Sequence, residues 1–283
     1  MENIIPRAKH YLHPADFSRM FELCHNYKWL NAKSLEFCEL WNMTDNESQK
    51  KLIEQLIKKF TYISFDYLDE ITKLIAEYIS SIWMLTSENA IITAICDNGR
   101  PDGSQTIVQN IKNKFRPSWD KTKIFSNILE AVHILTDNTS IILIDDFIGT
   151  GNTICRKIQY VKDYCIRNNI KNVIIKVVAL AVMDFAQKSI VDANVEILPY
   201  FCLRKGIDSI PNEEERDNAT NAMKALELKL DQTHLKRYRF GFENSQSLFS
   251  LGDNNVPNNV FPIFWWPSNS KKQERNTIFH RQL

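Results

Sequence analysis

The first 85 residues carry hydrophobic positions at helical spacing. Two apolar stripes, Leu52 to Phe60 and Ile71 to Ile82, repeat every three or four residues. Thr44 and Glu47 have the spacing of a capping box, which predicts that the first of these helices begins there. We therefore expect residues 1–86 to form an N-terminal helical region.

From residue 87 onward, apolar runs alternate with amphipathic segments. Strands are expected at Ile91–Cys96, Ile141–Ile144 and Val173–Met183, and helices at Gln105–Phe115 and Ile154–Ile166. This alternation predicts an α/β domain with a mainly parallel sheet and flanking helices. We assign residues 87–283 to this domain, including a C-terminal elaboration.

The C-terminal part has a different pattern. Acidic residues directly after Pro211 favour the start of one more helix, which is expected to reach about Leu230. Beyond it, Ser247–Leu251 and Val260–Trp266 flank a segment rich in Asn and Pro, which predicts a pair of C-terminal strands. If the second segment is a strand, its consecutive tryptophans point to opposite faces, and the outer one needs a second surface, which is the cover of the acceptor site, a second subunit or an operon partner. The alternative is that the N-terminal helical region buries both rings.

Composition restricts the class of protein. The 283 residues include 35 Lys and Arg against 34 Asp and Glu, so no overall basic field favours general nucleic-acid binding. The six cysteines form no Cys-x-x-Cys pair, and no apolar run approaches the roughly 20 residues of a membrane span. We expect a soluble cytoplasmic protein with reduced cysteines and no membrane partner.

Glycine is scarce and concentrated. The chain has seven glycines, below the roughly 7% of an average protein, and four of them lie in two loops, Gly99–Gly103 and Gly149–Gly151. Each loop follows an expected strand and precedes an expected helix. Backbone N–H groups at such helix N-termini bind anions, so the sequence predicts two phosphate-binding turns at one edge of the sheet.

The second loop belongs to the segment Ile141–Thr153, in which a buried strand runs into two acids and a hydroxyl-rich turn. A Walker A loop would need a Lys that neither glycine loop contains. A dinucleotide fingerprint would need a small residue where the larger Ile154 stands. An ordinary strand-to-helix turn with polar N-capping residues is the structural alternative.

The order of strand, two acids and Thr-Gly-x-Thr turn resembles the motif with which type I phosphoribosyltransferases bind 5-phosphoribosyl-1-pyrophosphate (PRPP). The resemblance implies that Asp145 and Asp146 hold the ribose hydroxyls and act in catalysis. It further implies PRPP binding through its 5′-phosphate at Gly149, Thr150, Gly151, Asn152 and Thr153. The first glycine loop corresponds to the pyrophosphate loop of that family, which implies pyrophosphate binding by Arg100, Gly103 and Ser104.

The C-terminal segments Gly241–Ser245 and Asn254–Trp266 are similar to a divergent branch called PRTase-CE, found in bacterial conflict systems. Members are associated with antiviral operons, including retrons. The resemblance therefore implies a role in antiviral defence and a protein or ribonucleoprotein partner from the same operon.

One position departs from the family pattern. Purine-salvage members commonly have an acid where this chain has Gly149, and glycine cannot take a proton from an incoming base. Asp184 follows the expected strand Val173–Met183, at the sheet edge that would face the acceptor. It is the acceptor-side candidate, although an acid at a strand end is often a cap.

These observations predict a phosphoribosyltransferase, a glycosyltransferase that binds PRPP with Mg²⁺ and transfers the phosphoribosyl group to an unidentified acceptor. No residue is assigned as a direct metal ligand. The alternative is a non-catalytic subunit of a defence complex, which binds PRPP or a nucleotide in a regulatory role or acts as a scaffold.

Overall fold

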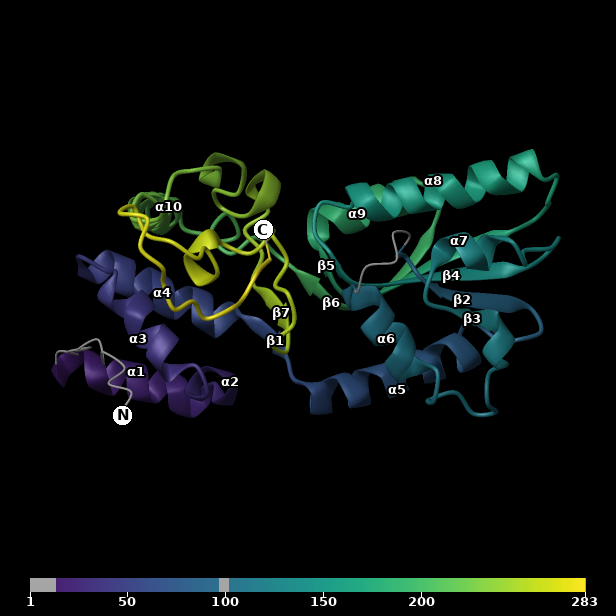
Figure 1. Ribbon diagram of the computed structural model, residues 1–283, viewed down its shortest axis with the longest axis horizontal. Coiled ribbons are helices and arrows are strands. Elements are labelled where there is room, and N and C mark those ends of the chain that lie inside the picture. The colour runs from purple at the N-terminus through teal and green to yellow at the C-terminus, as the bar shows by residue number, and fades with distance from the viewer. Residues whose placement is uncertain (1–13, 97–101, 283) are drawn as a thin grey trace, which may run out of the picture. The chain divides into compact units, whose positions relative to one another are not determined.

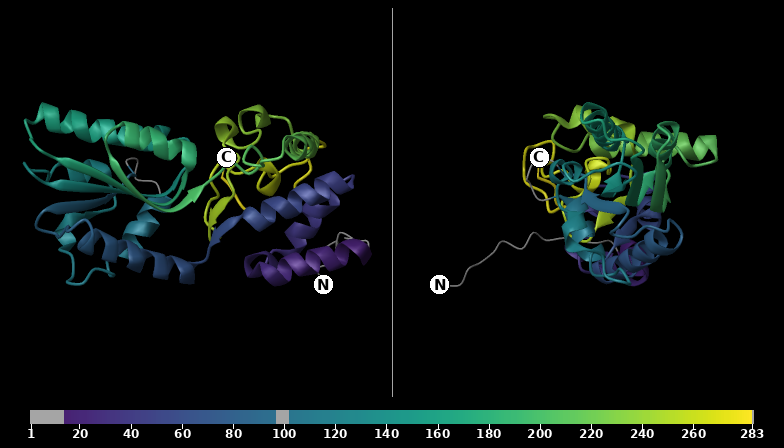
Figure 2. Two further views of the ribbon diagram at one scale, coloured as in Figure 1. Left: turned by 180° about the vertical axis from the view of Figure 1, so that it is seen from behind. Right: turned by 90° about the vertical axis from the view of Figure 1, so that its right-hand side faces the viewer.

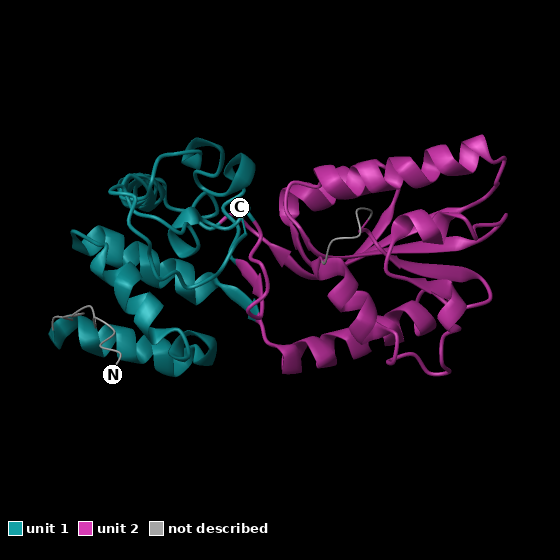
Figure 3. Ribbon diagram, viewed as in Figure 1, with its two compact units in different colours: residues 1–62, 206–248, 258–283 teal, residues 63–205, 249–257 magenta. Residues whose placement is uncertain are grey.

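The computed structural model describes residues 14–96 and 102–282, and its chain forms two compact units (Figure 3). Unit 1 comprises residues 1–62, 206–248 and 258–283, and unit 2 comprises residues 63–205 and 249–257. The helices expected over residues 1–86 contribute α1 to α4 to unit 1 and α5 to unit 2.

Unit 2 is built on a five-stranded parallel sheet (Figure 1). In the order β3-β2-β4-β5-β6, its strands are Ile124–Phe125, Ala90–Ala94, Ser140–Ile148, Ile174–Met183 and Glu196–Leu203. All four neighbouring pairs are parallel. This confirms the α/β fold expected from the alternation of apolar runs and amphipathic segments.

Helices cover both faces of the sheet, which is why its central strands contain long apolar runs (Figures 1 and 2). On one face, α5 and α6 pack in a core with β2 and β4; on the other, α7, α8 and α9 pack in a second core. These helices are α5 (Phe65–Ser81), α6 (Gly103–Ile111), α7 (Ile128–Val132), α8 (Asn152–Arg167) and α9 (Asp184–Asp192).

The central strand β4 is longer than expected. It runs through both acids to Ile148, whereas the apolar pattern predicted its end at Ile144. Parallel pairing with β5 continues in register beyond the apolar run, from Asp145 opposite Ala179 to Ile148 opposite Val182. The acids therefore lie on a strand instead of in the turn that follows it.

The other elements of unit 2 agree with the expected positions to within a few residues. β5 and α8 match their expected segments, whereas α6 begins at Gly103 and ends at Ile111, four residues before the expected end. A capping box formed by Asp102 and Gln105 fixes the earlier start of α6. Unit 2 also contains a short 3₁₀ helix, η1 (Lys121–Lys123).

Unit 1 is mainly helical. It contains α1 (Pro14–Asn26), α2 (Lys28–Asn31), α3 (Ser34–Asn42), α4 (Glu47–Lys59), α10 (Glu213–Glu227), η2 (Leu235–Arg237), η3 (Phe242–Asn244) and η4 (Pro262–Phe264). The apolar stripe of α4 is buried, as its spacing predicts. Its expected capping box at Thr44 is wrong, because the N-cap is Asn46, whose side chain accepts from the backbone N–H of Gln49 at 3.1 Å.

The C-terminal segments do not form the expected strand pair. β7 (Phe249–Leu251) pairs with β1 (Thr61–Ile63), and Val260 makes only a single parallel bridge to Ser247. Trp265 and Trp266 follow η4 and are 1% and 3% exposed, so the structure does not offer either ring to a partner. The strand expectation fails because Pro262 opens a 3₁₀ turn at this point.

No helix of the described residues is long and apolar enough to cross a membrane. All six cysteines are free thiols, in agreement with the absence of paired cysteine motifs.

Candidate functional site

The two acids of β4 lie at the carboxyl end of the sheet, where ligands bind in open α/β folds. Asp145 is only 7% exposed and Asp146 is half-buried. The Asp145 carboxylate accepts a hydrogen bond from the backbone N–H of Asp146 at 2.9 Å. Two carboxylates are thus held next to each other by the backbone of one strand.

Burial and mutual repulsion make these carboxyls reluctant to ionise. Burial raises the pKa of Asp145 well above its usual value, and the charges of Asp146 and Asp102 raise it further. Burial together with the charge of Asp102 raises the pKa of Asp146 to about 6. Hydroxyl donors or a cation in front of the pair would relieve this repulsion, so the electrostatics suit a sugar or a metal ion.

The turn after β4 leaves the start of α8 without a side-chain cap. Its N-cap is Gly151, which has a left-handed φ of 84° and carries no side chain that can accept from the first-turn N–H groups. Asn152 and Thr153 are exposed, and Gly149 and Gly151 are buried. The Asn152 backbone N–H donates to the Thr150 hydroxyl at 3.5 Å, and the helix dipole at this start favours an anion.

The start of α6 is arranged in the opposite way. Asp102 accepts from the backbone N–H of Ser104 at 2.7 Å and also from the Ser104 hydroxyl, and Ser104 is fully buried. Gly103 lies against the carboxylate of Asp146, and a Cβ there would lie closer than 3.0 Å to Cγ, Oδ1 and Oδ2. The glycine thus allows α6 to begin beside the β4 acids, while an acid occupies its N-terminus.

Asp184 is the first residue of α9, directly after β5. It is exposed, and its carboxylate accepts from the backbone N–H of Phe185 at 2.8 Å. Two residues further, Ala186 lies beside the turn, since a Cβ at Gly151 would be 3.5 Å from the Ala186 Cβ. Asp184 therefore lies at the same sheet edge as the acids and the turn.

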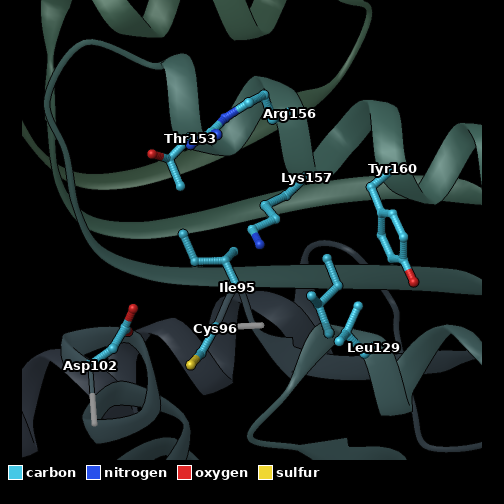
Figure 4. Close-up of a pocket in the computed structure, with 9 residues that line it drawn as sticks. Ile95, Cys96, Asp102, Leu129, Thr153, Arg156, Lys157 and Tyr160 are labelled. Carbon is cyan, nitrogen blue, oxygen red and sulfur yellow. The ribbon is translucent and has the colours of Figure 1, made fainter. Parts of the chain in front are cut away.

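A cavity of about 420 Å³ adjoins the turn within unit 2 (Figure 4). Thr153, Arg156, Lys157 and Tyr160 of α8 line one side, and the described residues on the other sides are Ile95, Cys96, Asp102, Ile128 and Leu129. The Lys157 side chain points into the cavity toward Ile95 (Figure 4). The cavity thus joins a cationic helix face to an apolar floor.

The structure brings most of the expected site residues to one edge of the sheet. The β4 acids, the turn Gly149–Thr153, Gly103 and Asp184 meet there, whereas Ser104 is turned into the capping box. Arg100 lies outside the described residues. Sequence reasoning missed Asp102, although its spacing to Gln105 is that of a capping box. It also missed Arg156 and Lys157, which follow the turn by one helical turn.

The donor set at this edge suits Mg²⁺ brought by a phosphate ligand. Carboxylate oxygens are ligands that Mg²⁺ prefers, and this ion commonly uses one or two carboxylates together with substrate phosphates and water. Asp145 and Asp146 provide such a pair. Among residues 14–96 and 102–282, no group of three or more His, Cys, Asp or Glu is placed to hold a metal alone.

The model of the PRTase-CE family matches residues 31–281. The chain belongs to the PRTase-CE family. This membership, expected from the β4 motif and the C-terminal segments, suggests a phosphoribosyltransferase-like role for this PRTase-CE protein. A search of curated proteins found no match.

Solved structures with partial similarity to this PRTase-CE protein share 11% identity with it. They include orotate phosphoribosyltransferase of Mycobacterium tuberculosis with inorganic phosphate (TM-score 0.34; 58% of this chain and 93% of that chain covered). A protein from Neisseria gonorrhoeae with bound ppGpp has a TM-score of 0.35, with 57% and 97% covered. A protein from Aquifex aeolicus has a TM-score of 0.33, with 69% and 86% covered.

Proposed function

We propose that unit 2 binds PRPP with Mg²⁺ and transfers its phosphoribosyl group to an acceptor, releasing pyrophosphate. The observation that carries this proposal is the uncapped start of α8 at Gly151, five residues after the second β4 acid. A phosphate on the first-turn N–H groups of α8 would leave the attached ribose near Asp145 and Asp146. Family membership supports the same ligand class.

In this reaction, the bond between ribose C1′ and the pyrophosphate oxygen breaks, and an acceptor lone pair forms the new bond to C1′. Positive charge develops on the ribose as the leaving group departs. Asp145 and Asp146 would orient the ribose through its hydroxyls, and their negative charge favours the developing cation. Mg²⁺, held with the ligand by these acids, would neutralise charge on the departing pyrophosphate.

The acceptor must lose a proton when it forms the new bond. Gly149 has no side chain to take it, so the base comes from another element. We assign the acceptor side to Asp184, which is exposed at the same sheet edge. Its carboxylate accepts a hydrogen bond from the backbone N–H of Phe185 at 2.8 Å, which fixes its orientation at the start of α9.

The alternative is a binding protein without transferase activity. The missing side chain at Gly149 favours it, because binding would be retained while the usual position for a base is empty. The two functions separate in one pair of measurements. A transferase releases pyrophosphate from PRPP when its acceptor is present, whereas a regulatory subunit binds PRPP and leaves it intact.

The binding step is tested by calorimetry with PRPP and Mg²⁺. Replacing both acids, Asp145→Asn with Asp146→Asn, should lower the affinity for PRPP at least tenfold, because a hydrogen bond to a charged group contributes about 1.5–3 kcal/mol. Asp163→Asn, which removes an exposed carboxylate on α8, is the matched control and should bind as the wild type does. Unchanged affinity in the folded double variant would remove the ribose assignment.

We extend the proposal to a role in antiviral defence, as part of a retron-type or related operon, with a protein or ribonucleoprotein partner. Its support is membership in the PRTase-CE family together with the conflict-system association that the sequence resemblance implies. Co-purification of the chain with its operon neighbours during phage infection, followed by mass spectrometry, tests this role. Purification of the chain alone under these conditions would contradict it.

A further inference from the structure

The cavity beside α8 extends beyond the turn that we assign to the 5′-phosphate. Thr153, Arg156, Lys157 and Tyr160 occur at helical spacing, so they share one face of α8. Thr153 ends the turn, and Tyr160 lies seven residues later, about 10 Å along the helix at 1.5 Å per residue. A ligand that ends at its 5′-phosphate would leave most of this face unused.

The charges along the cavity favour a second anion. Arg156 and Lys157 are cationic, and the one acid among the described lining residues is Asp102. The Asp102 carboxylate is already engaged by the N–H and hydroxyl of Ser104. The Lys157 side chain reaches into the cavity below Arg156 (Figure 4). A phosphate next to the turn would therefore meet two cations.

The far part of the cavity suits a ring. Ile95 and Ile128 are buried in the core beneath it, and Leu129, 39% exposed, stands at the rim. The half-buried Tyr160 packs on the same core from α8. An aromatic side chain above an apolar floor favours a planar group, and the volume of about 420 Å³ lies in the range of small-molecule sites, ~300–1,000 Å³.

We propose that this cavity binds a nucleotide extension of the phosphoribosyl ligand, in which the 5′-phosphate is joined to a further phosphate and a base. Arg156 and Lys157 hold the second phosphate, and Tyr160 with Leu129 receives the ring. The inference rests on the proposed function, because it requires the first phosphate at Gly149–Thr153. It makes the preferred ligand a ribose linked through a diphosphate to a nucleoside instead of PRPP alone.

Calorimetry with two ligands that share a ribose 5-phosphate end tests the inference. ADP-ribose carries the extension and ribose 5-phosphate lacks it. In the wild-type chain, ADP-ribose should bind at least tenfold more tightly. Replacing both cations, Arg156→Gln with Lys157→Gln, should remove this advantage and leave the affinity for ribose 5-phosphate unchanged, because the turn itself is intact.

The matched control is Arg167→Gln with Lys171→Gln, which removes the same charge at the last residue of α8 and in the segment after it, and which should retain the tighter binding of ADP-ribose. Equal affinity for the two ligands in the wild type, or an advantage that survives in the Arg156 and Lys157 double variant, would overturn the inference. A double variant that loses PRPP affinity without any preference for ADP-ribose would assign the cavity to pyrophosphate and overturn it as well. Failure of ribose 5-phosphate to bind the wild type would instead reject the proposed function.

Discussion

Two helices begin at the carboxyl edge of the sheet, and their N-termini differ in charge: α6 carries a capping carboxylate, and α8 does not. At α6, Asp102 supplies a carboxylate to the first turn and belongs to a full capping box. At α8, the N-cap Gly151 supplies no carboxylate to the first turn, and the helix dipole there favours an anion. Both follow a parallel strand and contain glycine, so glycine content alone does not identify the phosphate site. The cap does, because an anion and a capping carboxylate compete for the same donors.

An acidic cap on α8 would make its N-terminus resemble that of α6, and we expect this change to have the largest effect. Gly151→Asp should lower the affinity for ribose 5-phosphate more than 100-fold in calorimetry. The new carboxylate would accept from the N–H groups that we assign to the phosphate, and its charge would repel the phosphate. Each lost bond to a charged group contributes about 1.5–3 kcal/mol.

Gly151→Asn is the control, since Asn tolerates the left-handed φ of 84° at this position and adds no charge. It should bind more tightly than the Asp variant. Equal affinities for the two variants, or wild-type affinity in Gly151→Asp, would show that the turn does not bind the phosphate.

Gly103→Ala tests why α6 starts with a glycine. The added methyl would overlap the Asp146 carboxylate, and overpacking of this kind costs about 1–3 kcal/mol in the free energy of unfolding. In an Asp146→Ala background the overlap is absent, and Ala should stabilise the helix by about 0.5–1 kcal/mol relative to Gly. Urea denaturation of the wild type, the two single variants and the double variant measures whether the effect of Gly103→Ala on the free energy of unfolding changes sign. The same destabilisation in both backgrounds would contradict a direct contact.

Asp146→Asn tests whether the negative charge of Asp146 destabilises the folded state. The folded pKa of about 6 lies above the usual 3.8, so the folded state holds this proton more tightly than the unfolded chain does. The contribution of Asp146 to stability is therefore full below pH 3.8 and is lost as the pH rises through 6. Asp146→Asn should be more stable than the wild type by about 1–2 kcal/mol at pH 7.5, and this gain should shrink toward pH 4. Thermal unfolding across this range is the measurement, and a gain that does not depend on pH would refute the electrostatic cause.

The smallest effect is expected at the α6 cap. Asp102→Ala should lower the free energy of unfolding by about 1 kcal/mol, the usual contribution of an N-cap. Asp102→Asn should leave it nearly unchanged because Asn also caps. Both variants remove the charge that raises the pKa of Asp146, so its titration, followed by NMR, should move to lower pH in both. Equal destabilisation by Ala and Asn in urea would show that the charge of Asp102, and not its hydrogen bonds, stabilises α6.

The parallel core of unit 2 was predictable because its strands are buried on both faces and therefore read as apolar runs. The end of β4 was not, since Asp145 and Asp146 have low strand propensity and only pairing with β5 extends the strand through them. Similarly, Thr44 and Glu47 satisfied a local capping pattern, yet Asn46 is the residue placed to cap α4. The capping-box spacing of Asp102 and Gln105 is also present in the sequence and could have identified Asp102 as the cap of α6.

The candidate site was predictable where its chemistry lies in one continuous segment, as in Ile141–Thr153. It was less predictable where the contribution depends on which face of a helix meets a cavity, as for Arg156 and Lys157. The C-terminal strand pair failed for a related reason. The apolar residues of Val260–Trp266 are buried in a compact turn of unit 1, where the Trp265 indole donates to the Val260 carbonyl at 2.8 Å. Burial of such a turn leaves the same apolar signal as a strand.

The three separate segments of unit 1 have a consequence for the order of synthesis. All five strands of the unit 2 sheet lie between Ala90 and Leu203, so that sheet can assemble while the ribosome is still translating the rest of the chain. Phe279, in contrast, stacks on Phe60 and Trp29 in the unit 1 core. The aromatic surface of the first helices therefore stays open until the last segment emerges, and a nascent chain of this protein should need chaperone protection for unit 1 longer than for unit 2.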